Sequence, residues 1–157
     1  MKTVNEIMTT DVYSVRDDWS LETLSQFFFD KQISGAPVVD KNDNLIGVVS
    51  LSDVARNNTV PVTDTRESAV HDYYHDSKFP GISREDMELL KVESESIVTV
   101  KDVMTPLVYD VTQDASIKTT AETMLRGHIH RVLVTNGSKL VGIVSTMDML
   151  KVVVNSR

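Results

Sequence analysis

The chain has 157 residues, of which 41% are hydrophobic and 25% charged, a composition typical of a globular protein. Its formal net charge is -7, and this acidity argues against binding to a nucleic-acid backbone. It contains no cysteine, which excludes disulfides and thiolate chemistry and makes a reducing cytosol the default. The N-terminal stretch has no apolar signal core and no segment approaches the ~20 apolar residues that span a bilayer, so we expect a soluble cytoplasmic protein without membrane insertion.

The sequence repeats itself. A shift of 96 residues places TVNEIMTTDVYSV (3–15) on TVKDVMTPLVYDV (99–111), and the register continues without a gap to Ile33 and Ile129. After that point SGAPVVDKNDNLIGVVSLSD matches HRVLVTNGSKLVGIVSTMD with one residue fewer, in a polar turn where length changes are tolerated. We therefore expect three parts: one repeat at 1–58, a helical insertion or linker at 59–98, and a second repeat at 99–157.

Each repeat is predicted to fold as β-α-β-β-α after a short capped turn. Thr3 and Thr99 are each followed three positions later by an acidic residue, which is the pattern of a capping box. Ser20 and Ser116 are expected to open amphipathic helices at 20–32 and 116–128. The remaining elements are strands at 11–15, 36–40 and 45–50 and a helix at 51–57, with counterparts at 107–111, 132–136, 140–145 and 146–154.

The segment between the repeats has a different character. Helical patterns at 64–76 and 83–95 predict an α-helical hairpin rather than a third repeat. His71 and His75 are one helical turn apart, which is a spacing that suits a metal, but no third ligand is evident. We therefore interpret them as part of a polar, aromatic helix face and expect no metal.

One short motif occurs in both repeats: Ser50-x-x-Asp53 and Ser145-x-x-Asp148, each after a glycine and an apolar strand. Two interpretations stand. As a structural feature, each motif is a capping box at the start of a helix. As a functional feature, a carboxylate in the first turn of a helix accepts hydrogen bonds from the hydroxyls of a ribose, and the helix N-terminus favours a nearby anion.

The order β-α-β-β-α with GhhSxxD, where h is apolar, resembles a cystathionine-β-synthase (CBS) domain, and two in tandem resemble a Bateman module. The resemblance covers both repeats and leaves the insertion unexplained. It implies an α+β fold with pseudo-twofold symmetry, two clefts between the repeats, and binding of adenosine compounds such as AMP, ADP, ATP or S-adenosylmethionine. It also implies that each cleft takes residues from both repeats.

By this resemblance the better nucleotide cleft contains Asp148, with the pair at 130 and 131 reaching the phosphate because arginine is a forked, permanent cation. The first repeat has Ser34 and Gly35 in place of that pair, so the two clefts are expected to differ. The predicted residues of the better cleft are Thr9, Asp11, Tyr13, Ile33, Ser34, Gly35, His130, Arg131, Ile143, Ser145 and Asp148. Those of the second cleft are Val48, Ser50, Asp53, Thr105, Leu107, Tyr109 and Ile129.

No nucleophile motif, glycine-rich phosphate loop or metalloprotease helix is present in the sequence, so we expect no catalytic residues and no enzyme activity. Two functions stay open. The chain is either a stand-alone regulatory module that binds an adenosine nucleotide, AMP foremost, and signals to an unidentified effector protein, or a scaffold that binds none. We also expect a homodimer formed by apolar helix faces that bear Phe27–Phe29, Met124, Met147 and Met149–Val154.

Overall fold

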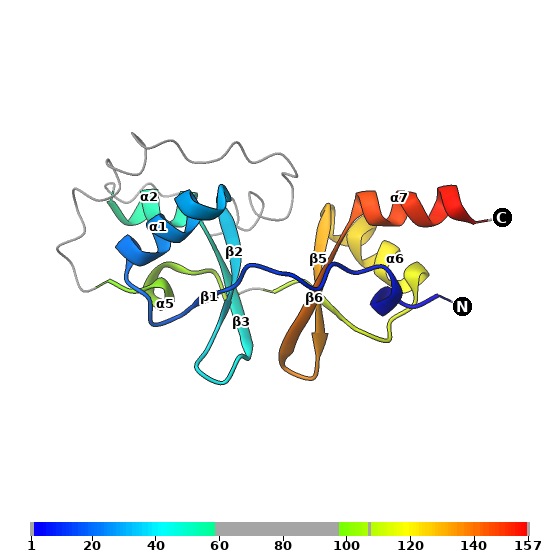
Figure 1. Cartoon of the computed structure of the whole chain (residues 1–157), viewed down its shortest axis with the longest axis horizontal. Coiled ribbons are helices and arrows are strands. Elements are labelled where there is room, and N and C mark those ends of the chain that lie inside the picture. The colour runs from blue at the N-terminus through cyan, green and yellow to red at the C-terminus, as the bar shows by residue number, and fades with distance from the viewer. Residues whose placement is uncertain (1, 59–97, 107, 157) are drawn as a thin grey trace.

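The structure is a computed structural model that describes residues 2–58, 98–106 and 108–156 (Figure 1). Three predictions lie outside the described residues: the helices at 64–76 and 83–95, the pair of histidines at 71 and 75, and the second-cleft residue Leu107. The described part contains the repeated motifs of both halves, whereas the boundaries at 58 and 99 stay a prediction.

Two three-stranded sheets, each with its own helices, form the described part of the chain (Figure 1). The first unit consists of β1 (Val15–Arg16), α1 (Leu21–Lys31), β2 (Gly35–Val39), β3 (Leu45–Ser50) and α2 (Leu51–Asn58). The second consists of β4 (Asp110–Thr112), α6 (Ile117–Gly127), β5 (Arg131–Asn136), β6 (Lys139–Ser145) and α7 (Thr146–Asn155). In the first sheet β1 runs parallel to β2 and β2 antiparallel to β3, and β4, β5 and β6 repeat this arrangement in the second. Short helical turns precede them: η1 (Val4–Glu6) and α5 (Val100–Val103). The predicted α+β class and element order are confirmed.

The strands expected at 11–15 and 107–111 begin later than predicted. Only Val15–Arg16 and Asp110–Thr112 join a sheet. The reason lies just upstream, where Thr9 is bonded to β6 of the second unit while Val15 belongs to the first unit's sheet. The residues between them must cross from one unit to the other, so they cannot extend the β1 ladder.

The predicted helix caps are confirmed. The Ser20 hydroxyl accepts a hydrogen bond from the Thr23 N–H at 3.1 Å, and Ser116 accepts one from Thr119 at 3.0 Å. Each bond satisfies one of the N–H groups that have no partner within the helix, and fixes where the helix begins. The buried face of α1 consists of Leu21, Leu24, Ser25 and Phe28.

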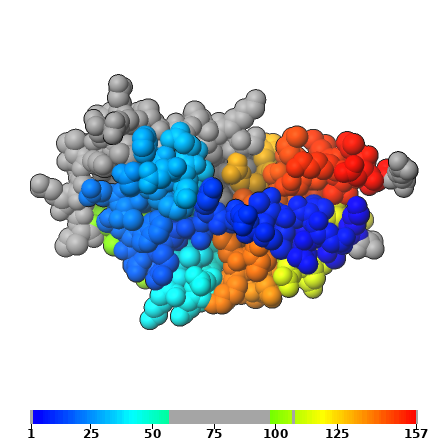
Figure 2. Space-filling view, in the orientation of Figure 1, coloured from blue at the N-terminus to red at the C-terminus, as the bar shows by residue number. Residues whose placement is uncertain are grey.

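The two units exchange their leading turns. The Val4 N–H donates to the Ala115 carbonyl of the second unit at 2.8 Å, and the Val100 N–H donates to the Trp19 carbonyl of the first at 2.9 Å. Both valines are fully buried, each in the core of the opposite unit. Figure 2 shows the N-terminal segment, in dark blue, lying across the second unit. Each core is therefore completed by a residue from the other half.

Backbone pairing between the units follows a pseudo-twofold axis. Thr9 and Ile143 exchange two hydrogen bonds of 2.9 Å each, N–H to carbonyl in both directions. Their counterparts Thr105 and Val48 exchange bonds of 2.8 and 2.9 Å. The same short antiparallel bridge thus occurs twice, with the roles of the two repeats reversed.

The hairpin turns of the two sheets meet on this axis. Asn44 forms a bridge with Lys139, the residue at the equivalent position of the other repeat. The Leu45 N–H donates to the Ser138 carbonyl at 2.9 Å, and the Ser138 hydroxyl donates to the Asn44 side chain at 2.7 Å. The polar turn, where the repeats differ by one residue, is therefore an inter-unit contact.

Two glycines permit the close approach of the exchanged segments. A Cβ on Gly47 would lie 2.6 Å from the Thr105 carbonyl oxygen. A Cβ on Gly142 would lie 2.5 Å from the Met8 sulfur and 3.0 Å from the Thr9 carbonyl oxygen. Hence the glycine that precedes each apolar strand run is required by contact with the opposite repeat.

Candidate functional site

The Asp148 carboxylate is held in a fixed orientation at the start of α7. Its Oδ2 accepts hydrogen bonds from the Ser145 backbone N–H and from the Ser145 hydroxyl, both at 2.9 Å. Its Oδ1 lies 3.3 Å from Nζ of Lys151, a side chain that is 69% exposed. The Asp148 side chain is 16% exposed, so solvent reaches a carboxylate whose orientation the Ser145 bonds have already fixed.

Several predicted residues of this cleft meet at the end of β6. Thr9 is bonded to Ile143, two residues before Ser145 on the same strand. Arg131 lies opposite Ser145 in the β5–β6 ladder, so their side chains project from the same face of the sheet. The carbonyl of His130 accepts a 2.9 Å hydrogen bond from the first residue of α7. The structure therefore brings these five residues and the Asp148 helix start together.

Tyr13 is placed differently. Its ring packs edge-on against Phe27 of α1, with centroids 6.2 Å apart, and the Lys31 ammonium lies 5.2 Å from the ring centre. Asp11, on the same crossing segment, is exposed. These contacts tie Tyr13 to the first unit's helix, and a role for either side chain in a ligand site stays a prediction.

Ser34 carries an unsatisfied hydroxyl. The residue is 5% exposed, and its Oγ has no hydrogen-bond partner. Its carbonyl accepts a 2.9 Å bond from Leu51, and the next residue, Gly35, pairs with Ser50. A buried hydroxyl without a partner costs about 1–3 kcal/mol, so such a group is a place where a ligand or an ordered water is expected. Ile33, just before it, is half-buried.

The counterpart carboxylate, Asp53, is held by more partners. Its Oδ2 accepts the Ser50 N–H at 2.8 Å and the Ser50 hydroxyl at 3.2 Å. Its Oδ1 accepts a hydrogen bond from the Arg56 guanidinium at 2.7 Å. The Asp53 side chain is only 5% exposed. This carboxylate is therefore more buried than Asp148 and pairs with a more tightly held cation.

The other described residues of the second cleft are also enclosed. Val48 and Thr105, which are bonded to each other, are 2% and 4% exposed. Ile129 is 4% exposed, and the carbonyl of half-buried Tyr109 accepts a 3.1 Å bond from Leu133. The structure brings Val48, Thr105 and Ser50 into one neighbourhood, but it leaves little surface there for a ligand.

Sequence reasoning missed the two cations. Arg56 and Lys151 occupy equivalent positions, three residues after each aspartate, and each forms an ion pair with it. The sequence could have indicated both ion pairs, because each basic residue follows its aspartate by three positions and side chains three apart on a helix lie on one face. The Ser145 motif is a complete capping box, as the structural interpretation held. In the Ser50 motif the aspartate likewise accepts from the serine N–H and hydroxyl. In both motifs these bonds orient the carboxylate, as the functional interpretation requires.

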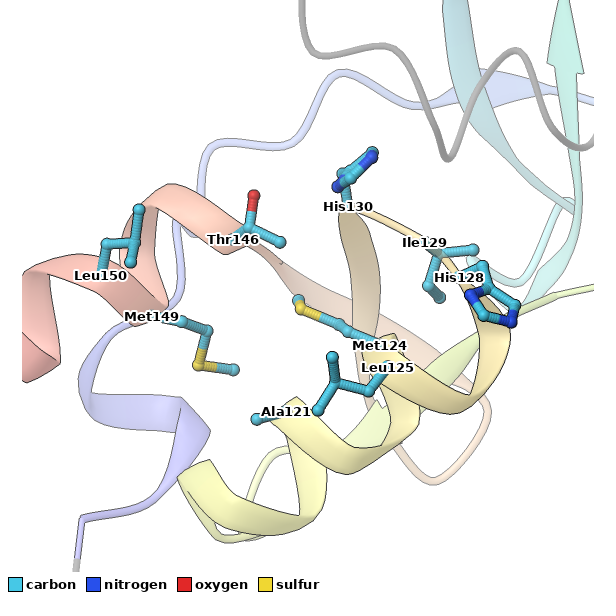
Figure 3. Close-up of a pocket in the computed structure, with 9 residues that line it drawn as sticks. All are labelled: Ala121, Met124, Leu125, His128, Ile129, His130, Thr146, Met149 and Leu150. Atoms are coloured by element: carbon cyan, nitrogen blue, oxygen red, sulfur yellow. The ribbon is translucent and has the colours of Figure 1, made fainter.

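An apolar pocket of about 630 Å³ lies between α6 and α7. In Figure 3, Met124 and Met149 point toward each other across it, with Ala121, Leu125 and Leu150 around them and His130 at its rim. Of the predicted dimer surface, Phe28 and Met124 prove to be core residues, 0% and 4% exposed, because they complete the packing under each sheet. Four other residues of the predicted surface are exposed, namely Met147, Leu150, Val153 and Val154, and so is Leu125, which the prediction did not include.

The described residues contain no group of three or more His, Cys, Asp or Glu side chains that would hold a metal ion. Nor does any helix within them have the length and apolar character to cross a bilayer.

Comparison with known proteins identifies the repeats. A family model described as CBS domain matches residues 4–60 and 100–155. The chain is 28% identical to the uncharacterized protein MJ1232 of Methanocaldococcus jannaschii over 96% of this chain and 39% of that protein, so it spans about two fifths of that relative's length.

Two solved structures share the fold. One is CBSX2 of Arabidopsis thaliana, in complex with AMP, at 23% identity and a TM-score of 0.65, covering 98% of this chain and 97% of that one. The other is the CBS domain pair of MJ0100, in complex with 5'-methylthioadenosine and S-adenosyl-L-methionine, at 17% identity and a TM-score of 0.61, covering 100% of this chain and 99% of that one.

Proposed function

This chain belongs to the CBS domain family, and we propose that it is a regulatory module that binds an adenosine compound in the cleft around Asp148. One observation carries the proposal: the Asp148 carboxylate is oriented by Ser145 and reached by solvent. An oriented carboxylate accepts the two hydroxyls of a ribose without losing conformational freedom on binding. The exposed Lys151 ammonium is a weak competitor, because surface ion pairs contribute little.

The unsatisfied hydroxyl of Ser34 supports ligand binding, and its assignment to the Asp148 cleft comes from the resemblance of the sequence to CBS domains. The cleft is expected to take its adenine end from Ile33–Gly35 and its ribose end from Asp148, so that both units contact one ligand. Ser34 would gain its missing hydrogen bond from that ligand. A ligand that contacts both units stabilises the relative orientation of the units in which all of its contacts form. Binding is expected to signal to an effector protein through this shift in orientation.

The adenosine class rests on proteins of the same fold. CBSX2 was solved with AMP, and MJ0100 with 5'-methylthioadenosine and S-adenosyl-L-methionine. The adenosine part is common to these three ligands. For a phosphate the chain offers Arg131, which shares a sheet face with Ser145 and is half-buried. A guanidinium there favours AMP, ADP or ATP over the sulfonium of S-adenosylmethionine, which carries a positive charge.

The test is isothermal titration of AMP, ADP, ATP and S-adenosylmethionine into the wild type, Asp148→Asn and the matched variant Asp53→Asn. Loss of one charged acceptor for two hydroxyls is expected to weaken binding on the order of 100-fold or more in Asp148→Asn. Asp53→Asn is expected to keep its affinity. Circular dichroism is the control that both variants are folded. Binding lost only in Asp53→Asn would reverse the assignment of the clefts, and absence of binding to all four compounds would favour the scaffold function.

We also propose that a second copy of the chain docks on the exposed apolar face of α7. Met147, Leu150 and Val154 are 58%, 55% and 81% exposed, and a solvent-facing apolar surface of this kind typically marks an interface. Light scattering of the wild type should give twice the 17.5 kDa chain mass. Leu150→Glu should reduce it to one chain, whereas Thr23→Glu on the exposed side of α1 should not. A wild type that stays monomeric at micromolar concentration would contradict this assignment.

A further inference from the structure

The two aspartates of the repeated motif differ in the cation that each one faces. Nη2 of Arg56 lies 2.7 Å from Asp53 Oδ1, and Nζ of Lys151 lies 3.3 Å from Asp148 Oδ1. The Arg56 side chain is 28% exposed, against 69% for Lys151. A second bond, from Arg56 Nε to the Ser52 carbonyl at 3.2 Å, fixes the guanidinium.

The residues around the two aspartates differ in the same direction. Ser50 is 1% exposed and Thr105 4%, whereas their counterparts Ser145 and Thr9 are half-buried and exposed. The bridge partners of these threonines show the same contrast, since Val48 is buried and Ile143 is only half-buried. The asymmetry therefore extends over the whole cleft and is not confined to one ion pair.

We propose that Arg56 keeps the Asp53 cleft closed to ligand, so that the chain binds one adenosine compound, at Asp148, although its sequence carries the motif twice. This inference rests on the proposed function and adds to it a stoichiometry and the residue that sets it. A ribose at Asp53 needs hydrogen bonds to the oxygen that Arg56 already occupies. It must displace a charge-assisted, largely buried bond, whereas at Asp148 it meets only an exposed ammonium.

The size of the effect follows from the strength of the bond to be displaced. A hydrogen bond between charged groups in a buried site changes an equilibrium on the order of 10- to 100-fold, and an exposed lysine pair changes it less than about 5-fold. The Asp53 cleft is accordingly expected to bind at least about 10-fold more weakly than the Asp148 cleft for this reason alone.

The test counts binding sites. AMP and S-adenosylmethionine are titrated separately into the wild type, Arg56→Ala, Arg56→Lys and the mirror variant Lys151→Arg. We expect one site per chain in the wild type and two in Arg56→Ala, with the second site removed again by Asp53→Asn in the same chain. Arg56→Lys preserves the charge and guards against a folding defect, and we expect a weak second site in it. Lys151→Arg is expected to weaken the Asp148 site by less than about 5-fold, because position 151 is exposed and an exposed ion pair contributes little.

The outcomes separate this inference from the proposed function. Two sites in the wild type, or one site in both Arg56 variants when each is folded, would overturn the role of Arg56 and leave the ligand-binding function intact. No site in the wild type and one in Arg56→Ala would overturn the assignment to Asp148 and uphold the closure by Arg56. No binding in any variant would overturn both.

Discussion

Replacing Gly47 with alanine tests whether the exchanged segments hold the two units together. The added Cβ would lie 2.6 Å from the Thr105 carbonyl oxygen, whereas carbon and oxygen approach comfortably to about 3.3–3.6 Å. The opposing atom is backbone, so no side-chain rotation relieves the contact. The segment around Thr105 must move away from β3 by roughly 0.7–1 Å.

That movement breaks specific bonds. Thr105 and Val48 exchange hydrogen bonds of 2.8 and 2.9 Å, and a shift of this size takes both beyond useful length. Two backbone hydrogen bonds contribute about 1 kcal/mol each, and the overpacking adds about 1–3 kcal/mol. We therefore expect Gly47→Ala to lower the free energy of unfolding by about 3–5 kcal/mol, a large share of the about 5–15 kcal/mol typical of a domain.

Urea denaturation followed by circular dichroism measures this change, with two glycines of the same chain as references. Gly127→Ala, at the last residue of α6, places its Cβ 3.5 Å from the nearest side-chain atom, an ordinary contact. It should stabilise the protein by about 0.4–1 kcal/mol, because alanine leaves the unfolded chain fewer conformations than glycine does. Gly142→Ala meets first the flexible Met8 side chain, so its cost should be lower than that of Gly47→Ala. A Gly47→Ala variant as stable as the wild type would refute the close approach on which the inter-unit pairing depends.

Two further predictions concern the exchanged turns. Val100→Ala removes two buried methyl groups and should lower the free energy of unfolding by about 2–3 kcal/mol. Amide hydrogen exchange should accelerate in α1, which belongs to the other repeat. Loss of protection confined to the second unit would contradict the packing of Val100 in the first unit. The Thr99 N–H and hydroxyl bonds hold the pKa of Asp102 below its ordinary value of 3.8, so the unfolded chain takes up this proton first as the pH falls. The stabilisation of the folded state by Asp102 is therefore complete above pH 3.8 and is lost as the pH falls below it. Asp102→Asn should flatten this part of the curve of unfolding free energy against pH. An unchanged curve would show that the bonds of this turn do not persist in solution.

Local sequence determined a large part of this protein. The tandem repeat can be read directly from the sequence. The helix starts at Ser20 and Ser116, and the bonds from Ser50 and Ser145 to the aspartates that follow them, are hydrogen bonds between residues three apart. Such bonds depend only on neighbours in the chain, so a pattern of residue types is sufficient to predict them. The pairing of β2 with β3, and of β5 with β6, follows in the same way from two β-branched runs joined by a short turn.

Only the tertiary structure decided which half completes which core. Val4 and Val100 each pack in the opposite unit, where they donate to the carbonyls of Ala115 and Trp19, and no pattern of neighbouring residues predicts such distant partners. Only the tertiary structure also explains why glycine is needed at position 47, because a Cβ there would collide with the carbonyl oxygen of Thr105, which is distant in the sequence. The difference between the two clefts also depends on burial: an arginine and a lysine at equivalent positions look interchangeable in sequence, and only the enclosure of Asp53 makes the pairing with Arg56 a barrier.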